Sequence, residues 1–293
     1  MSRKERTIRF YSFKISGDNS PEFYENVFHE AVELTRNEGF RAAPDYVIAS
    51  EQNRQFIFNL DEGGVFRFFG GDPQVEPVVY DANDGTSQSV SLGNGKWLVT
   101  DTLVYFRVTE KQRIIGIESK RNGITKRILE RLLDAATGKI RENADVGLTP
   151  IASADFEKSI LEFETIRKFS IVAQRPNPSF NDYATTLARH AASANAEKIG
   201  IDATAPRGES LDKESSYITE SLAMTRAPGG MVENVKVTGK KPGDERERTE
   251  SLKNNQERTR YRYDSNSGIG DRIMSFTRRC IPVVNNIISR RSS

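Results

Sequence analysis

The stretch DTLVYFRVTEKQRIIGIESKRNGITKRILERLLDAA, residues Asp101–Ala136, decides how the first half of this chain folds. Its first part alternates apolar and polar residues on either side of a short polar turn, which predicts two antiparallel strands joined as a hairpin. Its last part repeats apolar residues every three or four positions, which predicts a helix that begins at Asn122 and ends at Gly138. A hairpin followed by such a helix indicates a sheet with a helix packed on one face.

The end of the second predicted strand carries two charged residues, Glu118 and Lys120. Because side chains alternate along a strand, both point to one face, while Ile115 and Ile117 point to the other face and into the core. Two interpretations stay open. Either the charged pair is the solvated face of an edge strand, or it belongs to a site together with the acidic Asp101 on the preceding strand.

Asp101, followed on the next strand by Glu118 and Lys120 and then by a helix, is similar to the core of the restriction-endonuclease-like nucleases. The similarity covers about Asp101–Asp134. It implies that the two carboxylates bind Mg²⁺ or Mn²⁺, and that the lysine orients the attacking water and offsets phosphate charge. If the chain is not a nuclease, the sequence predicts no cofactor.

The composition of the chain limits which other kinds of catalytic or metal site it can form. With 293 residues, 36% of them hydrophobic, the chain is long enough to bury a core in one large or two modest domains. Cys280 is the only cysteine, so an internal disulfide or a zinc knuckle is excluded. There are two histidines, so catalysis would fall to carboxylates, lysine and arginine. The net charge of +2 argues against a protein that coats nucleic acid.

No run of apolar residues reaches the roughly 18 to 20 that a membrane-spanning helix needs, and the N-terminus lacks a signal-peptide pattern. We therefore expect a cytoplasmic protein with no transmembrane segment.

The order of the predicted elements indicates an α+β protein in two lobes. A strand-rich lobe is expected at 1–153, and a ferredoxin-like α/β sandwich at 154–293. In the second lobe, the polar segment 240–256 is expected to be a solvated hairpin tip or a mobile loop, and the chain closes with a basic C-terminal tail that begins in a short helix. The predicted elements are strands at 7–15, 45–49, 54–60, 65–69 and 76–81, a helix from 21 to 39, and then, in the second lobe, strands at 165–174, 198–205 and 231–239 with helices at 182–196 and 211–224.

A second candidate site combines basic and aromatic residues near the C-terminus. The segment RTRYRYD, residues 258–264, predicts a strand with one basic face and one aromatic face. Arginines on such a strand would bind phosphates while tyrosines stack on bases. The alternative is a half-buried strand with packed tyrosines and solvated arginines. The candidate nucleic-acid-binding residues are Arg258, Arg260, Tyr261, Arg262, Arg278 and Arg279.

Several segments together resemble a family of bacterial proteins of about this length that have no agreed activity and are often encoded beside phage-defence or mobile-element genes. The resemblance implies an accessory cytoplasmic protein of two α+β lobes that senses phage nucleic acid or a phage protein. The segments are FYSFKI (10–15), SKRNGITKRILERLLD (119–134), IRKFSIVAQRPNP (166–178), IGIDATAPRGESL (199–211) and VKVTGK (235–240).

From these observations we expect a non-enzymatic nucleic-acid-binding or sensing component of a bacterial defence system. Two alternatives stay open: a metal-dependent nuclease that uses Asp101, Glu118 and Lys120, and a protein interaction subunit of a defence complex. Nucleic acid, a partner protein of the defence system and a second copy of the chain are all open as partners.

Overall fold

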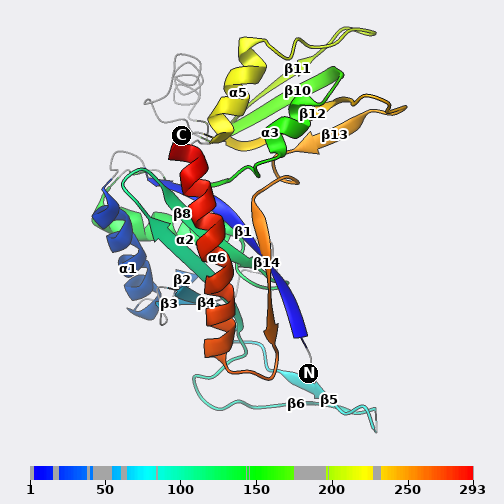
Figure 1. Cartoon of the computed structure of the whole chain (residues 1–293). Coiled ribbons are helices and arrows are strands. Elements are labelled where there is room, and N and C mark those ends of the chain that lie inside the picture. The colour runs from blue at the N-terminus through cyan, green and yellow to red at the C-terminus, as the bar shows by residue number, and fades with distance from the viewer. Residues whose placement is uncertain are drawn as a thin grey trace.

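The structure is a computed structural model with two lobes, one above the other in Figure 1. The larger lobe is built on an antiparallel sheet with helices on both faces, and the smaller lobe is built on a second antiparallel sheet. The predicted α+β class and the strand-rich first lobe are confirmed. The structure describes residues 3–15, 20–37, 40–41, 55–60, 65–83, 85–142, 144, 146–174, 196, 198–226 and 232–292. The strand expected at 45–49 lies outside these residues, and so does the helix expected at 182–196 except for its last residue.

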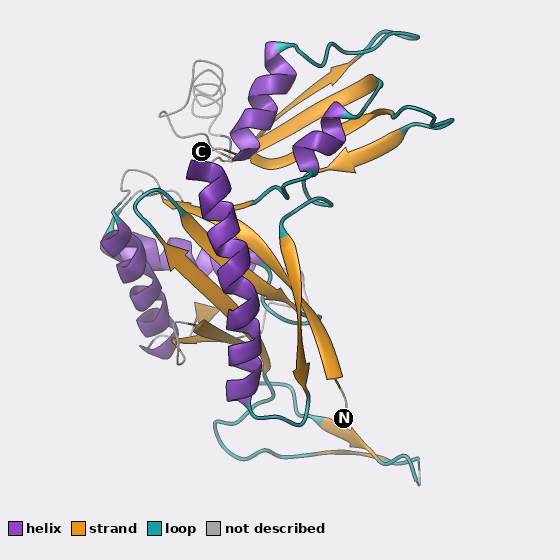
Figure 2. Cartoon of the chain, viewed as in Figure 1, coloured by secondary structure: helices purple, strands orange, loops and turns teal. Residues whose placement is uncertain are grey.

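The larger lobe contains an eight-stranded sheet in the order β14-β1-β8-β7-β4-β3-β2, with β9 paired to β1. The strands β5 and β6 form a separate hairpin that projects from the lobe (Figure 2). The elements of this lobe are β1 (Arg3–Ile15), α1 (Pro21–Asn37), β2 (Phe40–Arg41), β3 (Gln55–Leu60), β4 (Val65–Gly71), β5 (Val78–Tyr80), β6 (Ser87–Ser89), β7 (Thr100–Val108), β8 (Arg113–Ser119), α2 (Lys126–Ile140), β9 (Val146–Pro150), β14 (Arg258–Asp264) and α6 (Ile269–Ser292).

Both faces of this sheet are buried. On β1, Phe13 and Ile15 pack against α1 and α2, whereas Ile8 and Phe10 belong to the core under α6. This follows from the alternation of side chains along a strand, which turns an apolar segment into a wall between two cores. Strand β8 lies between β1 and β7, so it is an interior strand, and the interpretation of Glu118 on a solvated edge does not hold.

The basic C-terminal segment is a long helix and part of the core. We predicted a short helix followed by a tail, but α6 spans Ile269–Ser292 and continues past Pro282. A proline inside a helix removes one backbone hydrogen bond. The sheet contacts offset this loss because one stripe of α6 is buried at helical spacing. The buried stripe consists of Ile273, Phe276, Cys280, Val284 and Ile287.

The smaller lobe has a four-stranded antiparallel sheet in the order β11-β10-β12-β13. A ferredoxin-like split arrangement would insert a strand between successive strands of a βαβ unit. Here β10 and β11 are neighbours, so the strand order differs from that expectation. The segment expected as a hairpin tip or loop at 240–256 contains β13. The elements are α3 (Phe156–Leu161), β10 (Thr165–Gln174), β11 (Lys198–Thr204), α5 (Ser216–Arg226), β12 (Val232–Lys240) and β13 (Arg248–Ser251).

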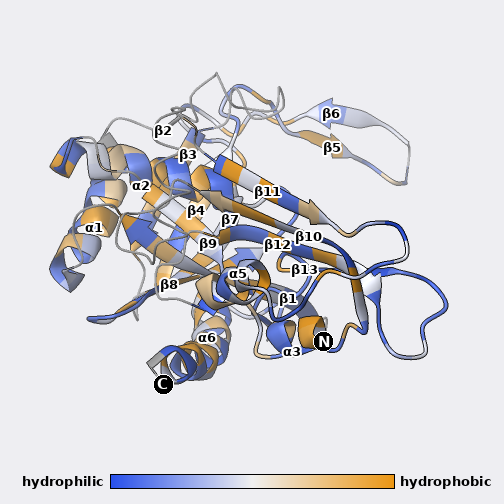
Figure 3. Ribbon diagram, turned by 90° about the horizontal axis from the view of Figure 1, so that it is seen from above, coloured by the Kyte–Doolittle hydropathy of each residue, from blue (hydrophilic) through white to orange (hydrophobic). Residues whose placement is uncertain are grey.

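Hydrophobic residues form a packed core against each sheet. The loops that extend from the smaller lobe are hydrophilic (Figure 3). Phe169 and Ile171 of β10 pack with Ile218 and Leu222 of α5 in the core of the smaller lobe. Among the described residues, no helix combines the length and the hydropathy that crossing a membrane requires.

The chain passes from the larger to the smaller lobe after β9 and crosses back near residue 256. Ala152 forms a bridge with Gln256, and the backbone N–H of Glu257 donates to the carbonyl of Ile151 at 2.7 Å. Beyond this point β14 pairs with β1, from Arg9↔Arg258 to Arg3↔Asp264. The second lobe is therefore an insertion in the first, and the segment 257–293 that we assigned to the second lobe packs in the first.

Candidate functional site

A tight turn follows β8 and begins at Lys120, one of the three residues predicted to form a site. The N–H of Gly123 donates to the carbonyl of Lys120 at 3.0 Å, and Asn122 adopts a φ of 61°. A Cβ on residue 123 would lie 2.7 Å from Thr102 Oγ1, so glycine is required there. The helix expected to begin at Asn122 begins later, since Thr125 is the N-cap and accepts from the N–H of Ile128.

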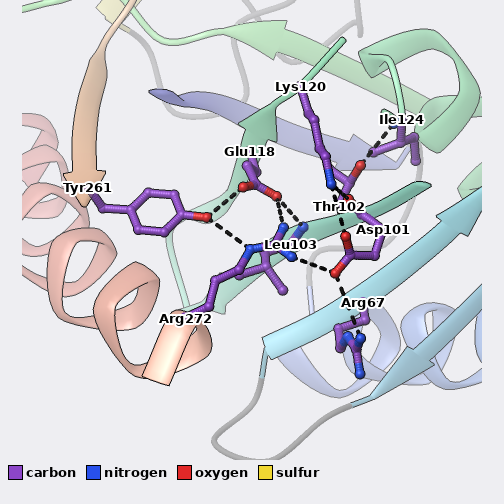
Figure 4. A network of polar contacts seen from close by, with 9 residues as sticks. All are labelled: Arg67, Asp101, Thr102, Leu103, Glu118, Lys120, Ile124, Tyr261 and Arg272. Atoms are coloured by element: carbon purple, nitrogen blue, oxygen red, sulfur yellow. Dashed lines mark hydrogen bonds and ion pairs between the residues drawn. The ribbon is translucent and has the colours of Figure 1, made fainter. Parts of the chain in front are cut away.

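The acid and the base predicted on neighbouring strands are in direct contact (Figure 4). Lys120 Nζ lies 3.0 Å from Asp101 Oδ1 and 3.2 Å from the Asp101 carbonyl oxygen. Arg67 approaches the same carboxylate, with NH2 at 3.7 Å from Oδ2. Asp101 is thus surrounded by cations, and its side chain keeps about a fifth of its surface exposed.

Arg272 of α6 lies between the two carboxylates. Its NH1 donates to Asp101 Oδ2 at 2.6 Å, and its NH2 donates to Glu118 Oε2 at 2.5 Å. Glu118 is 0% exposed and Arg272 is 8% exposed. The guanidinium thus bridges the two carboxylates with one N–H group to each, and these charge-assisted hydrogen bonds fix the start of α6 against β7 and β8.

Glu118 has two further donors. The hydroxyl of Tyr261 donates to Oε1 at 2.5 Å, and the N–H of Leu103 donates to Oε2 at 3.2 Å. Tyr261 is 1% exposed, and its ring packs edge-on against Phe276. We call the group formed by Asp101, Glu118, Lys120, Tyr261 and Arg272 the buried polar network.

Burial and charge set the ionisation of this network. Burial and the neighbouring Glu118 raise the pKa of Tyr261 far above its usual value, so the phenol stays a neutral donor. Burial alone would lower the pKa of Arg272, but Glu118, Tyr261 and Asp101 raise it overall. For Asp101, burial raises the pKa, and Arg272 and Lys120 outweigh it and lower the pKa overall.

The network does not fit a divalent metal ion. Each carboxylate oxygen of Asp101 and Glu118 already accepts from at least one N–H or O–H donor. A metal between the two carboxylates would have to displace the guanidinium of Arg272. In the part of the chain that the structure describes, no three His, Cys, Asp or Glu side chains gather to hold a metal. The geometry therefore gives the network a structural explanation as a buried set of ion pairs.

The six predicted nucleic-acid-binding residues do not lie on one surface: five are on two separate surfaces, and Tyr261 is in the core. Arg258, Arg260 and Arg262 are exposed on one face of β14. Tyr261 points to the opposite face, under α6, so a base cannot stack on it in this structure. Arg278 and Arg279 are exposed on α6, which covers that opposite face, so they lie on a different surface from the β14 arginines.

The β14 arginines lie beside the N-terminal half of β1. The register pairs Arg258 with Arg9 and Arg262 with Glu5. Glu5 bridges two of the arginines, with Oε1 at 3.0 Å from Arg260 NH1 and Oε2 at 2.8 Å from Arg262 Nε. The hydrogen bond from Arg262 is the main cause of a lowered pKa for Glu5. We call Arg9, Arg258, Arg260 and Arg262 the arginine row.

Sequence reasoning missed Arg272, although the pattern held a signal for it. Arg272, Phe276 and Cys280 are four residues apart, so the arginine occupies the buried stripe of α6. A charged residue on an apolar stripe needs a buried partner, and the acids 154 and 171 residues earlier supply it.

A family model described as a domain of unknown function, DUF4747, matches residues 6–277. The match covers both lobes and most of the chain, so the protein belongs to this family. No curated protein matches the chain.

Proposed function

We propose that this member of the DUF4747 family is a nucleic-acid-binding component that does not cleave its target. The arginine row would contact the phosphate backbone. The setting we propose is bacterial defence against phage, in the cytoplasm, with phage nucleic acid as the ligand. The observation that carries the proposal is the convergence of four arginines on one exposed face from opposite ends of the chain.

The spacing of the row suits a phosphate backbone. Arg258, Arg260 and Arg262 alternate along one strand, so their Cα atoms lie about 7 Å apart. One strand of a duplex carries a phosphate about every 3.4 Å along its axis, so neighbouring arginines would meet every second phosphate. The guanidinium fork also matches phosphate geometry better than an ammonium group does.

The ion pairs with Glu5 leave the row available. The side chains of Arg260 and Arg262 are 70% and 71% exposed, and a surface ion pair of this kind is weak. Arg258 has no ion-pair partner among the described residues. A phosphate would replace Glu5 as the acceptor, and the row would keep an excess of positive charge in a protein of nearly neutral net charge.

The test is fluorescence anisotropy with labelled single- and double-stranded DNA and RNA over a range of salt. The triple variant Arg258→Gln/Arg260→Gln/Arg262→Gln should weaken binding to all sequences and reduce the salt slope by about one for each lost phosphate contact. The matched control, Arg278→Gln/Arg279→Gln, removes arginines from α6 and should bind like the wild type if the row is the contact surface. Glu5→Gln should strengthen binding.

Equal binding by the wild type and the triple variant would contradict the proposal. Loss of binding in the α6 control alone would move the surface to that helix.

The nuclease remains a second candidate because Asp101, Glu118 and Lys120 do converge. The same samples, incubated with Mg²⁺ or Mn²⁺, decide between the two. We expect intact nucleic acid, since every carboxylate oxygen already has a donor. Cleavage by the wild type that disappears in Glu118→Gln would favour the nuclease.

A protein interaction subunit is a third candidate, favoured by exposed apolar residues around the β5–β6 hairpin. Val78 is 64% exposed, Tyr80 is 65% exposed and Leu98 is 60% exposed. Exposed apolar patches often mark protein contacts. Failure to bind any nucleic acid at low salt would favour this role over the one we propose.

A further inference from the structure

A cavity of about 250 Å³ lies where the two lobes meet. Its lining includes the apolar side chains of Ile151, Phe156 and Ile287, which we call the apolar wall. The lining also includes arginines from the ends of two helices, Arg226 at the end of α5 and Arg290 and Arg291 at the end of α6. In Figure 1 the C-terminal end of α6 lies beside α5, which agrees with these shared lining residues.

The positive charges at this cavity exceed the negative ones. Arg226 pairs with Glu157 at 3.1 Å, and Arg290 pairs with Glu257 at 2.6 Å. Arg291 donates from NH2 to the carbonyl oxygen of Thr225 at 3.2 Å, and no carboxylate among the described residues contacts it. Among the described residues, three arginines therefore face two carboxylates, and neither carboxylate pairs with Arg291.

In the part of the chain that the structure describes, Arg291 makes one side-chain hydrogen bond, to the carbonyl oxygen of Thr225. A guanidinium carries five N–H donors, and this hydrogen bond uses one of them on a neutral acceptor. Burial, with a smaller contribution from Arg290, lowers the pKa of Arg291 to about 10. Both effects disfavour the charged form, and an anion beside the guanidinium would reverse them. A partly buried cation next to an open cavity is thus suited to an anionic ligand.

We propose that this cavity binds a small phosphate monoester. Arg291 would hold the phosphate, Arg226 and Arg290 would add positive potential, and the apolar wall would receive a small hydrophobic group. Phosphate suits the site because its oxygens accept from several guanidinium forks at once. The volume lies below the roughly 300 Å³ at which typical ligand pockets begin, which excludes a dinucleotide or a large cofactor.

The site is separate from the arginine row. It lies between the lobes, whereas the row lies on the outer face of β14 and β1. A ligand here contacts α5 of the smaller lobe and α6 of the larger lobe together. Binding would therefore stabilise one arrangement of the lobes, so a small molecule would act on the same molecule that we propose binds nucleic acid.

The test is isothermal titration calorimetry of the full chain with phenyl phosphate, with phenol as the neutral counterpart and inorganic phosphate as the head group alone. We expect phenyl phosphate to bind, inorganic phosphate to bind more weakly and phenol not to bind. Arg291→Gln should weaken phenyl phosphate binding by at least about tenfold, since a hydrogen bond to a charged group is lost. Arg278→Gln, the same change on the exposed side of α6, should leave it unchanged.

A second variant keeps the test decisive if Arg291→Gln does not fold. Ala154→Trp fills the cavity from an exposed lining position without touching an arginine, and it should also abolish binding. The proposal is overturned if the wild type does not bind phenyl phosphate, if phenol binds as well, or if a folded Arg291→Gln or Ala154→Trp variant binds as the wild type does. The triple variant of the arginine row should retain phenyl phosphate binding, so the two proposals fail independently.

Discussion

At the scale of single residues, Glu118 holds a negative charge at a position with no exposed surface, and Arg272, Tyr261 and the backbone of Leu103 compensate it. Two of these partners come from β14 and α6, far along the chain. Removing one partner of a buried pair leaves the other charge without compensation, which costs more than the pair contributes. The network thus makes the C-terminal segment energetically dependent on β8.

This dependence gives a stability prediction. Glu118→Ala should lower the free energy of unfolding by about 3–5 kcal/mol, because Arg272 and Tyr261 stay buried after losing one acceptor each, and Arg272 keeps Asp101 as its one carboxylate in the network. Urea unfolding followed by circular dichroism measures the change. Glu25→Ala, an exposed glutamate on α1, is the matched control and should change stability little. A loss below about 1 kcal/mol in Glu118→Ala would contradict the account, since it would mean that the pair is not desolvated.

The lowered pKa of Asp101 gives a pH prediction. A carboxyl group whose pKa is lower in the folded than in the unfolded chain, where it is about 3.9, stabilises the fold above that value. The contribution is lost as the pH falls through the folded pKa. Asp101→Asn should therefore be less stable than the wild type at pH 7, and the difference should shrink at about pH 3 and below. Urea unfolding of both proteins across this range measures it, and a difference that stays constant with pH would contradict the assigned cause.

Side-chain direction within an element could be predicted from the sequence, but long-range partners could not. Alternation along β8 placed Glu118 and Lys120 on one face, away from Ile115 and Ile117, and the network and the core lie on those two faces. Nothing in that alternation identifies Arg272, which is 154 residues further along the chain. Whether Glu118 faces water or a helix depends on α6, and no local pattern contains that information.

At the scale of elements, the predictions that rested on periodicity and capping were reliable. The helix predicted from residue 21 is α1 at Pro21–Asn37, and the strand predicted at 165–174 is β10. The length of the C-terminal helix was underestimated because Pro282 and the arginines before it resemble the signals that end a helix. The stripe from Ile273 to Ile287 continued through the proline, and it was the better signal because burial against the sheet outweighs one lost hydrogen bond.

The alternation of arginine and tyrosine on β14 predicted that one face of the strand is basic and the other aromatic. It did not predict which elements each face contacts. The tyrosine face carries the packing, with Tyr261 stacked at 5.6 Å from Tyr263 and in contact with Phe276. The arginine face meets Arg9 and Glu5 of β1 only because β14 pairs with β1. The neighbours of a strand come from the sheet order, which local sequence does not specify.

At the scale of the whole molecule, the first lobe is closed by the last part of the chain. The pairing of β1 with β14 joins residues about 250 positions apart, as in Arg9↔Arg258, and α6 then covers the core that contains Ile8 and Phe10. The change in element order led us to expect a boundary near residue 153. The return of the chain to the first lobe could not be predicted, because pairing between distant strands leaves no local pattern.

This arrangement predicts which part of the chain can be removed. The ends of the inserted lobe lie side by side, since the N–H of Ser153 donates to the carbonyl of Asn255 at 2.9 Å. Replacing residues 155–254 with a hairpin loop of about four residues should therefore leave the eight-stranded sheet and α6 intact. The fragment 1–153 should instead aggregate, because it exposes the apolar face under α6. Chemical unfolding and size-exclusion chromatography compare the two, and a soluble, cooperatively folded 1–153 beside an unfolded deletion variant would show that β14 and α6 are not needed to complete the first lobe.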